Sequence, residues 1–152
     1  LIKELLGGDD TIHLLYAGIM WALASSDQKE ENPQKWHGDG GHLFDLFGTQ
    51  QQLPPHCINV FFPLINLTQQ HGPTEVIPGT HVAGQFNSNP DKSFGLECRA
   101  GDAILFDYRL KHRGGLNFSG DENRPILYLA YAKSWFRDTG NTRSGKSIFS
   151  NN

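Results

Sequence analysis

A histidine and an aspartate two positions apart are the first residues of this sequence whose types and spacing suggest chemistry. They are His37 and Asp39, separated only by Gly38. Side chains two positions apart in an extended segment point to the same face, so this pair aims an imidazole and a carboxylate at one place. A second imidazole from elsewhere in the chain would complete the facial set of three ligands that holds ferrous iron and leaves further coordination positions open.

The sequence must therefore supply another histidine, and its seven histidines offer several candidates. We expect His112, because it lies in the penultimate predicted strand, and a strand that crosses the mouth of a barrel would bring it beside His37. His42 and Asp45 are three positions apart and could bind a metal on a helix, but after a ligand segment we interpret them as neighbouring or surface groups. The remaining histidines are assigned to turns and hydrogen-bond networks or carry no signal: His56, His71, His81 and His13.

Arg124 begins the last predicted strand, where a hairpin would return it next to His112. A guanidinium group can bind a carboxylate at two points. A 2-oxo acid would fit such a site, with its keto and adjacent carboxylate oxygens on the metal, its far carboxylate on Arg124, and the last metal position left for O2. The alternative is a surface charge paired with Asp121 or Glu122.

Other side chains near the predicted site could contribute to substrate binding. Arg109 and Arg113 lie close to His112 in the sequence, and either could hold an acidic substrate. An apolar substrate wall could be formed by Trp21, Phe44 and Phe47, although packing in the core is the ordinary role of such residues.

Short apolar segments that alternate with Gly/Pro turns predict an all-β domain, a sandwich or jelly-roll barrel. A short helical turn is expected near residues 2–6. The predicted strands cover residues 12–24, 56–66, 74–77, 93–98, 103–107, 111–117 and 125–135. The Ser, Thr, Gly and Asn-rich residues 137–152 are expected to form a mobile tail or to cover a sheet edge.

Length and composition indicate one globular domain. The 152 residues are 38% hydrophobic, with a formal net charge of -3. The absence of a basic run argues against nucleic-acid binding. The longest apolar run, residues 14–24, is too short to span a bilayer, so no membrane association is expected. Cys57 and Cys98 are interpreted as thiols in a reducing cytosol, which predicts a cytoplasmic protein. No pattern indicates an oligomeric state.

Three segments together resemble the phytanoyl-CoA dioxygenase (PhyH) family of Fe(II)- and 2-oxoglutarate-dependent oxygenases. The resemblance runs from about residue 12 to residue 136. It is carried by Gln34-Lys35-Trp36-His37-Gly38-Asp39, by the segment His71-Gly72-Pro73-Thr74-Glu75-Val76-Ile77-Pro78-Gly79-Thr80-His81, and by Tyr108-Arg109-Leu110-Lys111-His112-Arg113-Gly114-Gly115-Leu116-Asn117 with Arg124.

The resemblance implies a double-stranded β-helix, a cupin-like jelly roll with minor helical segments. Residues 1–152 would form a single oxygenase domain that lacks the N-terminal part of the family fold. The implied catalytic metal ligands are His37, Asp39 and His112, and the implied cosubstrate residues are Arg124, Asn59, Phe61 and Thr74. Gly114 stands where relatives often have serine, which implies that one hydrogen bond to the cosubstrate is lost or replaced.

The activity implied by the resemblance is hydroxylation of a small organic molecule. Iron, 2-oxoglutarate and O2 would be used, with release of succinate and carbon dioxide. Asp39 favours oxygenation over halogenation, because related halogenases have a small residue in its place. Two alternatives stay open: a cupin-like metal enzyme that does not use 2-oxoglutarate, and a non-catalytic jelly-roll binding module.

Overall fold

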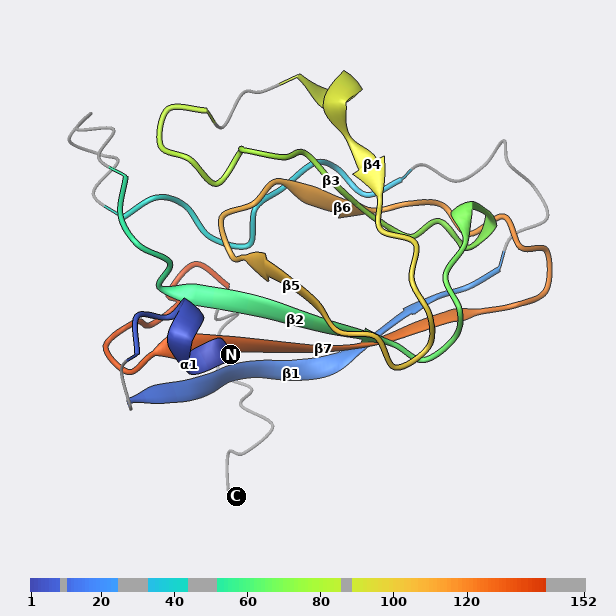
Figure 1. The fold of residues 1–152 in the computed structure, drawn as a ribbon. Coiled ribbons are helices and arrows are strands. Elements are labelled where there is room, and N and C mark those ends of the chain that lie inside the picture. Colours follow the sequence, from blue (N-terminus) through green and yellow to red (C-terminus); the bar gives the residue numbers. More distant parts are fainter. Residues whose placement is uncertain (9–10, 25–32, 44–51, 86–88, 142–152) are drawn as a thin grey trace.

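Two antiparallel β-sheets that face each other form the body of the molecule (Figure 1). The computed structural model describes residues 1–8, 11–24, 33–43, 52–85 and 89–141. The first sheet contains β1 (Ile12–Ala22), β2 (Cys57–Pro63), β5 (Ile104–Asp107) and β7 (Arg124–Lys133), in the order β1-β7-β2-β5. The second contains β3 (Thr74–Val76), β4 (Phe94–Gly95) and β6 (His112–Gly114), in the order β4-β3-β6. Three single helical turns are α1 (Ile2–Leu5), η2 (Gln69–His71) and η3 (Pro90–Lys92). This mostly β architecture confirms the predicted jelly roll.

β2 buries apolar side chains on both of its faces, as its sequence predicts. Alternate residues of a strand point to opposite sides of the sheet. Phe61 belongs to one core cluster, with Leu67, Phe106 and Ile126. Ile58 and Val60, which point the other way, pack with the fully buried Leu6 at the end of α1. The sheet therefore has one face toward the second sheet and one face that α1 partly covers (Figure 1).

The segment that carries His37 extends the second sheet beyond β6. His37 and His112 exchange two backbone hydrogen bonds of 3.0 and 2.8 Å, and the amide of Gln34 donates to the carbonyl of Gly114. Outside the backbone, the Arg113 guanidinium lies 4.4 Å above the centre of the Trp36 ring. These contacts fix residues 33–39 against β6 and so bring two sequence-distant histidines together.

Several strands are shorter than their apolar patterns predict. The 56–66 segment leaves the sheet at Pro63, which has no amide hydrogen to continue a ladder. Of the predicted strand 111–117 only His112–Gly114 is paired, because β3 offers β6 three partners. β4 is confined to Phe94–Gly95, which pair with Val76 and Glu75 of β3. Strand length in the second sheet is thus set by the partners.

The predicted tail begins with residues that contact the folded body. Asp138 is buried and is hydrogen-bonded by two tyrosines. Residues 142–152 lie outside the described part of the chain.

No helix among the described residues is long and apolar enough to cross a membrane. Cys57 and Cys98 are free thiols, and burial raises the pKa of Cys57 to about 12.

Candidate metal centre

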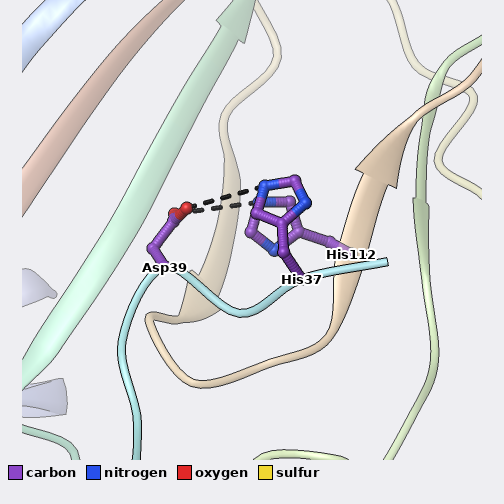
Figure 2. Close-up of side chains that lie close together, drawn as sticks. All are labelled: His37, Asp39 and His112. Carbon is purple, nitrogen blue, oxygen red and sulfur yellow. Dashed lines mark ion pairs between the residues drawn. The ribbon is translucent and has the colours of Figure 1, made fainter. Parts of the chain in front are cut away.

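His37, Asp39 and His112 converge at one point, as Figure 2 shows. A ligand atom from each residue lies within 4.8 Å of the others. The Nε2 atoms of His37 and His112 lie 3.8 and 3.7 Å from the two carboxylate oxygens of Asp39. These distances are too long for hydrogen bonds but suit groups that share one ion, since metal-ligand bonds of nitrogen and oxygen measure about 2.0–2.2 Å. The donor set fits a facial two-histidine, one-carboxylate metal site.

Backbone carbonyls orient both histidine rings. The Nδ1 atom of His37 lies 2.8 Å from the carbonyl of Lys35, and that of His112 lies 2.9 Å from the carbonyl of Leu110. A carbonyl can only accept, so each Nδ1 carries the proton and each Nε2 presents a lone pair to the site. Burial lowers the pKa of His112, an effect that the nearby Asp39 opposes. A neutral imidazole is the form that binds a metal.

Asn59 holds the carboxylate of Asp39. Its side-chain amide donates a 2.6 Å hydrogen bond to Oδ2 of Asp39. Asn59 therefore lies where the sequence predicts, on the face of β2 that it shares with Phe61, but it contacts the ligand side chain directly. Since this bond uses one lone pair of Oδ2 only, the carboxylate keeps its other lone pairs for an ion.

The three candidate ligands line a cavity of about 810 Å³. Phe61, Thr74 and Arg124, all predicted near the cosubstrate, line the same cavity. Thr74 is buried on β3, and the Phe61 ring packs edge-on against Phe106. Trp21 is at the exposed rim of the cavity, whereas the other predicted wall residues, Phe44 and Phe47, lie outside the described residues.

Arg124 is a buried cation without an acidic partner in the described part of the chain. One terminal nitrogen donates to the backbone carbonyls of His71 and Gly115, both at 3.2 Å. The buried Nε atom has no hydrogen-bond partner among the described residues. The alternative, a surface charge paired with Asp121 or Glu122, is wrong among the described residues, because Arg124 is buried without an ion pair and Glu122 lies 3.0 Å from His71 instead. Burial lowers the pKa of Arg124, and a buried, unpaired guanidinium that lines a cavity is suited to bind an anion.

Gln34 is a residue of this site whose role the sequence alone does not reveal. Its Oε1 accepts a 2.8 Å hydrogen bond from the amide of Gly114. A Cβ atom at Gly114 would lie 3.0 Å from this oxygen and 3.2 Å from a terminal nitrogen of Arg124. The missing side chain at position 114 thus makes room for the Gln34 amide beside the guanidinium. Only the spatial neighbourhood reveals this, because 80 positions separate the two residues.

Arg109 and Arg113, the two candidate substrate ligands, have other partners. Arg109 is 1% exposed and binds both carboxylate oxygens of Asp107, at 2.8 and 2.6 Å. Arg113 forms a 2.6 Å ion pair with Glu75 while it covers Trp36. Neither lines the main cavity. Arg109 shapes the turn before β6, and Arg113 fixes the segment that bears His37.

The remaining histidines do not join the metal ligands. His71 is bound by Thr68 and Glu122, and His81 lies beside a second hollow that Asp107 and Arg109 also line. His56 is buried against aromatic rings. His42 is not in the ligand group, and its predicted companion Asp45 lies outside the described residues.

Comparison with known proteins identifies the family. The profile of the phytanoyl-CoA dioxygenase (PhyH) family matches residues 7–126. The chain belongs to this family. Among curated relatives, dioxygenase hkm4 of Aspergillus hancockii is 37% identical over 119 residues, which cover 74% of this chain and 38% of the relative. Dioxygenase af480 of Aspergillus fumigatus is 34% identical over 89 residues, covering 56% of this chain and 29% of the relative. The chain thus spans about a third of the length of these relatives.

Solved structures share the fold at lower identity. HygX of Streptomyces hygroscopicus, a structure with nickel, 2-oxoglutarate and hygromycin B bound, superposes with a TM-score of 0.66 at 14% identity, over 89% of this chain and 61% of HygX. SnoN, titled a non-heme alpha ketoglutarate dependent epimerase from nogalamycin biosynthesis, gives a TM-score of 0.63 at 20% identity, over 93% of this chain and 55% of SnoN.

Proposed function

We propose that this chain carries the iron and 2-oxoglutarate centre of a non-haem dioxygenase that hydroxylates a small organic molecule. One observation carries the proposal: a two-histidine, one-carboxylate cluster and a buried arginine without an acidic partner in the described chain line the same cavity. Membership of the phytanoyl-CoA dioxygenase family supports it, as do the dioxygenase names of the curated relatives.

The residues fit both groups by the chemistry of their donors. His37, Asp39 and His112 would hold Fe(II), which accepts imidazole and carboxylate ligands. Arg124 would bind the far carboxylate of 2-oxoglutarate, which would satisfy the buried guanidinium. Gln34 supplies an amide next to Arg124, and Thr74 supplies a hydroxyl from β3.

The residues around the site would position the iron and the cosubstrate, and would not themselves undergo redox chemistry. When bound, the iron and 2-oxoglutarate supply oxidation of an unactivated C–H bond by O2, with release of succinate and carbon dioxide. Asn59 holds the Asp39 carboxylate, and the Lys35 and Leu110 carbonyls keep the histidine lone pairs directed inward. Phe61 and Tyr128 present aromatic surface to the cavity and exclude water from that side.

Anaerobic titration of the purified chain with Fe(II) and then 2-oxoglutarate tests the proposal. A weak visible charge-transfer band should develop as the keto acid chelates the metal. His112→Ala should abolish the band, because it removes a buried ligand. Arg124→Met should raise the apparent Kd for 2-oxoglutarate by about 30-fold or more, the usual cost of removing one partner of a buried charge pair.

A matched control is Arg99→Met, which removes an exposed arginine that does not line the cavity. This variant should titrate like the wild type. An iron-binding protein that develops no band with 2-oxoglutarate, and whose turnover is unchanged in Arg124→Met, would instead be a cupin-like metal enzyme without 2-oxoglutarate. A chain that binds no iron would be a non-catalytic binding module.

A further inference from the structure

Asp138, a buried carboxylate that the proposed chemistry does not use, is the centre of a hydrogen-bond network. Its Oδ2 accepts hydrogen bonds from the hydroxyls of Tyr108 and Tyr16, at 2.7 and 3.1 Å, and from the side-chain amide of Asn141 at 2.7 Å. Its Oδ1 accepts from the backbone amides of Gly140 and Asn141, both at 3.1 Å. The hydrogen bonds from these donors lower the pKa of Asp138, although its burial acts in the opposite direction. Asp138 thus fixes the turn that bears Asn141.

Asn141 connects this network to Asp39, a proposed metal ligand. Its side-chain amide also donates a 2.7 Å hydrogen bond to the backbone carbonyl of Asp39. On the other side of the same peptide segment, the carbonyl of Tyr108 accepts from the amides of Asp39 and Gly40, at 3.1 and 3.3 Å. The Tyr108 ring leaves no space for a side chain at Gly40, where a Cβ atom would lie 2.8 Å from it. The backbone of Asp39 is therefore held at both ends by residues of one network.

We propose that Asp138 and Asn141 form a C-terminal clasp that positions Asp39 for metal binding. The inference rests on the proposed function, because it treats Asp39 as a ligand. It adds two positioning residues from a stretch whose composition predicts a mobile tail. A carboxylate side chain is placed by its own backbone, so a mobile Asp39 peptide would spread its oxygens over many positions and weaken the metal site.

The test begins without any metal, by hydrogen exchange of the backbone amides in residues 37–43. Asn141→Ala removes the bond to Asp39 with little loss of packing, because Asn141 is exposed. The amides of Asp39 and Gly40 should exchange about 2- to 10-fold faster, in line with the loss of one hydrogen bond. Ser134→Ala is the matched control, since it removes a 3.0 Å side-chain hydrogen bond to Thr11 and none to the clasp.

The second readout is titration with Co(II), followed by its visible ligand-field absorption. Asn141→Ala should bind Co(II) about 10-fold more weakly than the wild type, as is typical when a group that orients a ligand is lost. Thermal unfolding of the metal-free variant should stay close to that of Ser134→Ala. A clasp with a merely structural role would lower thermal stability and leave the Co(II) affinity unchanged, and this result would overturn the proposal.

The two readouts separate the clasp from the proposed function. If wild-type protein fails to bind Co(II), the metal centre itself is wrong, and so is the role of the clasp in it. If wild type binds Co(II) but Asn141→Ala leaves the exchange of Asp39 and Gly40 unchanged, the clasp is wrong while the metal centre stands. Faster exchange together with weaker Co(II) binding supports both.

Discussion

His56 is a fully buried histidine outside the candidate site. It is 2% exposed, and neither ring nitrogen has a hydrogen-bond partner among the described residues. The ring packs 4.5 Å from that of Phe136. Burial, helped by the nearby Arg109 charge, lowers the pKa of His56 to about 4. The folded protein therefore contains this residue as a neutral aromatic group.

This burial predicts a specific loss of stability in acid. In the unfolded chain His56 binds a proton near pH 6.5, and in the folded chain only near pH 4. The stability that the neutral, buried ring contributes is therefore fully present above pH 6.5 and is lost as the pH falls toward 4. The two pKa values correspond to about 3 kcal/mol at most. His56→Phe should reduce the loss by about that amount, measured by urea unfolding at pH 7, 5 and 4. An unchanged loss in the variant would assign acid sensitivity to other groups.

At this scale the sequence identifies the three side chains that the structure brings together, but not the residues that hold them in place. His37 and Asp39 can be recognised because two positions along an extended segment fix the direction of both side chains. Asn141 has no such pattern: its role depends on a contact with Asp39 that spans 102 positions. Arg109 shows that sequence proximity can also mislead. It lies close to His112 in the sequence, which suggests a substrate contact, but its guanidinium binds Asp107, two residues away.

The connections between elements constrain the site as firmly as the strands do. Gly72 joins η2 to β3 with a φ of 59°, and a Cβ atom there would lie 2.0 Å from the carbonyl oxygen of Leu116. That close approach places the carbonyls of His71 and Gly115 around Arg124. The glycine thus allows two loops to meet at the proposed anion site.

Gly72→Ala should be severely destabilising. The substitution combines left-handed backbone strain with a backbone clash, so we expect a loss of about 3 kcal/mol or more in the free energy of unfolding. Gly101→Ala is the matched control, because Gly101 also has a positive φ, 86°, but open space around it. That variant should lose only about 1 kcal/mol. Urea unfolding of both proteins distinguishes the clash from the strain, and equal losses would contradict the role of the contact with Leu116.

The order and type of the elements could be predicted, whereas their ends could not. Apolar segments bounded by Gly/Pro turns identify β2 and β7, because their side chains fill the core on at least one face of the sheet. Residues 93–98 have a similar composition, yet only Phe94–Gly95 form a strand with β3, and Cys98 instead makes an isolated bridge to Leu67. In a small sheet the neighbouring strand determines where a strand ends, so the sequence of one segment alone does not predict its ends.

At the scale of the whole molecule, a bound metal would connect the 33–43 segment to the second sheet. His37 and Asp39 come from the former and His112 from β6. A ligand that binds only the folded state stabilises it by about 2.7 kcal/mol at a concentration a hundred times its Kd. We therefore expect Co(II) to raise the Tm by about 5–10 °C in a scan of wild-type protein. His112→Ala should show no rise, and an equal rise in that variant would place the metal elsewhere.

The long separation between Asp39 and Asn141 has a consequence for how the protein matures. As a nascent chain lengthens, His37 and Asp39 are synthesised well before His112, and the clasp follows later still. Contacts of such high sequence separation form slowly, because the intervening chain must be ordered first. We therefore expect the three proposed metal ligands to come together late in folding. A chain that ends before residue 141 would contain the His37–Asp39 motif, but it would lack the hydrogen bond from Asn141 that holds Asp39 in place.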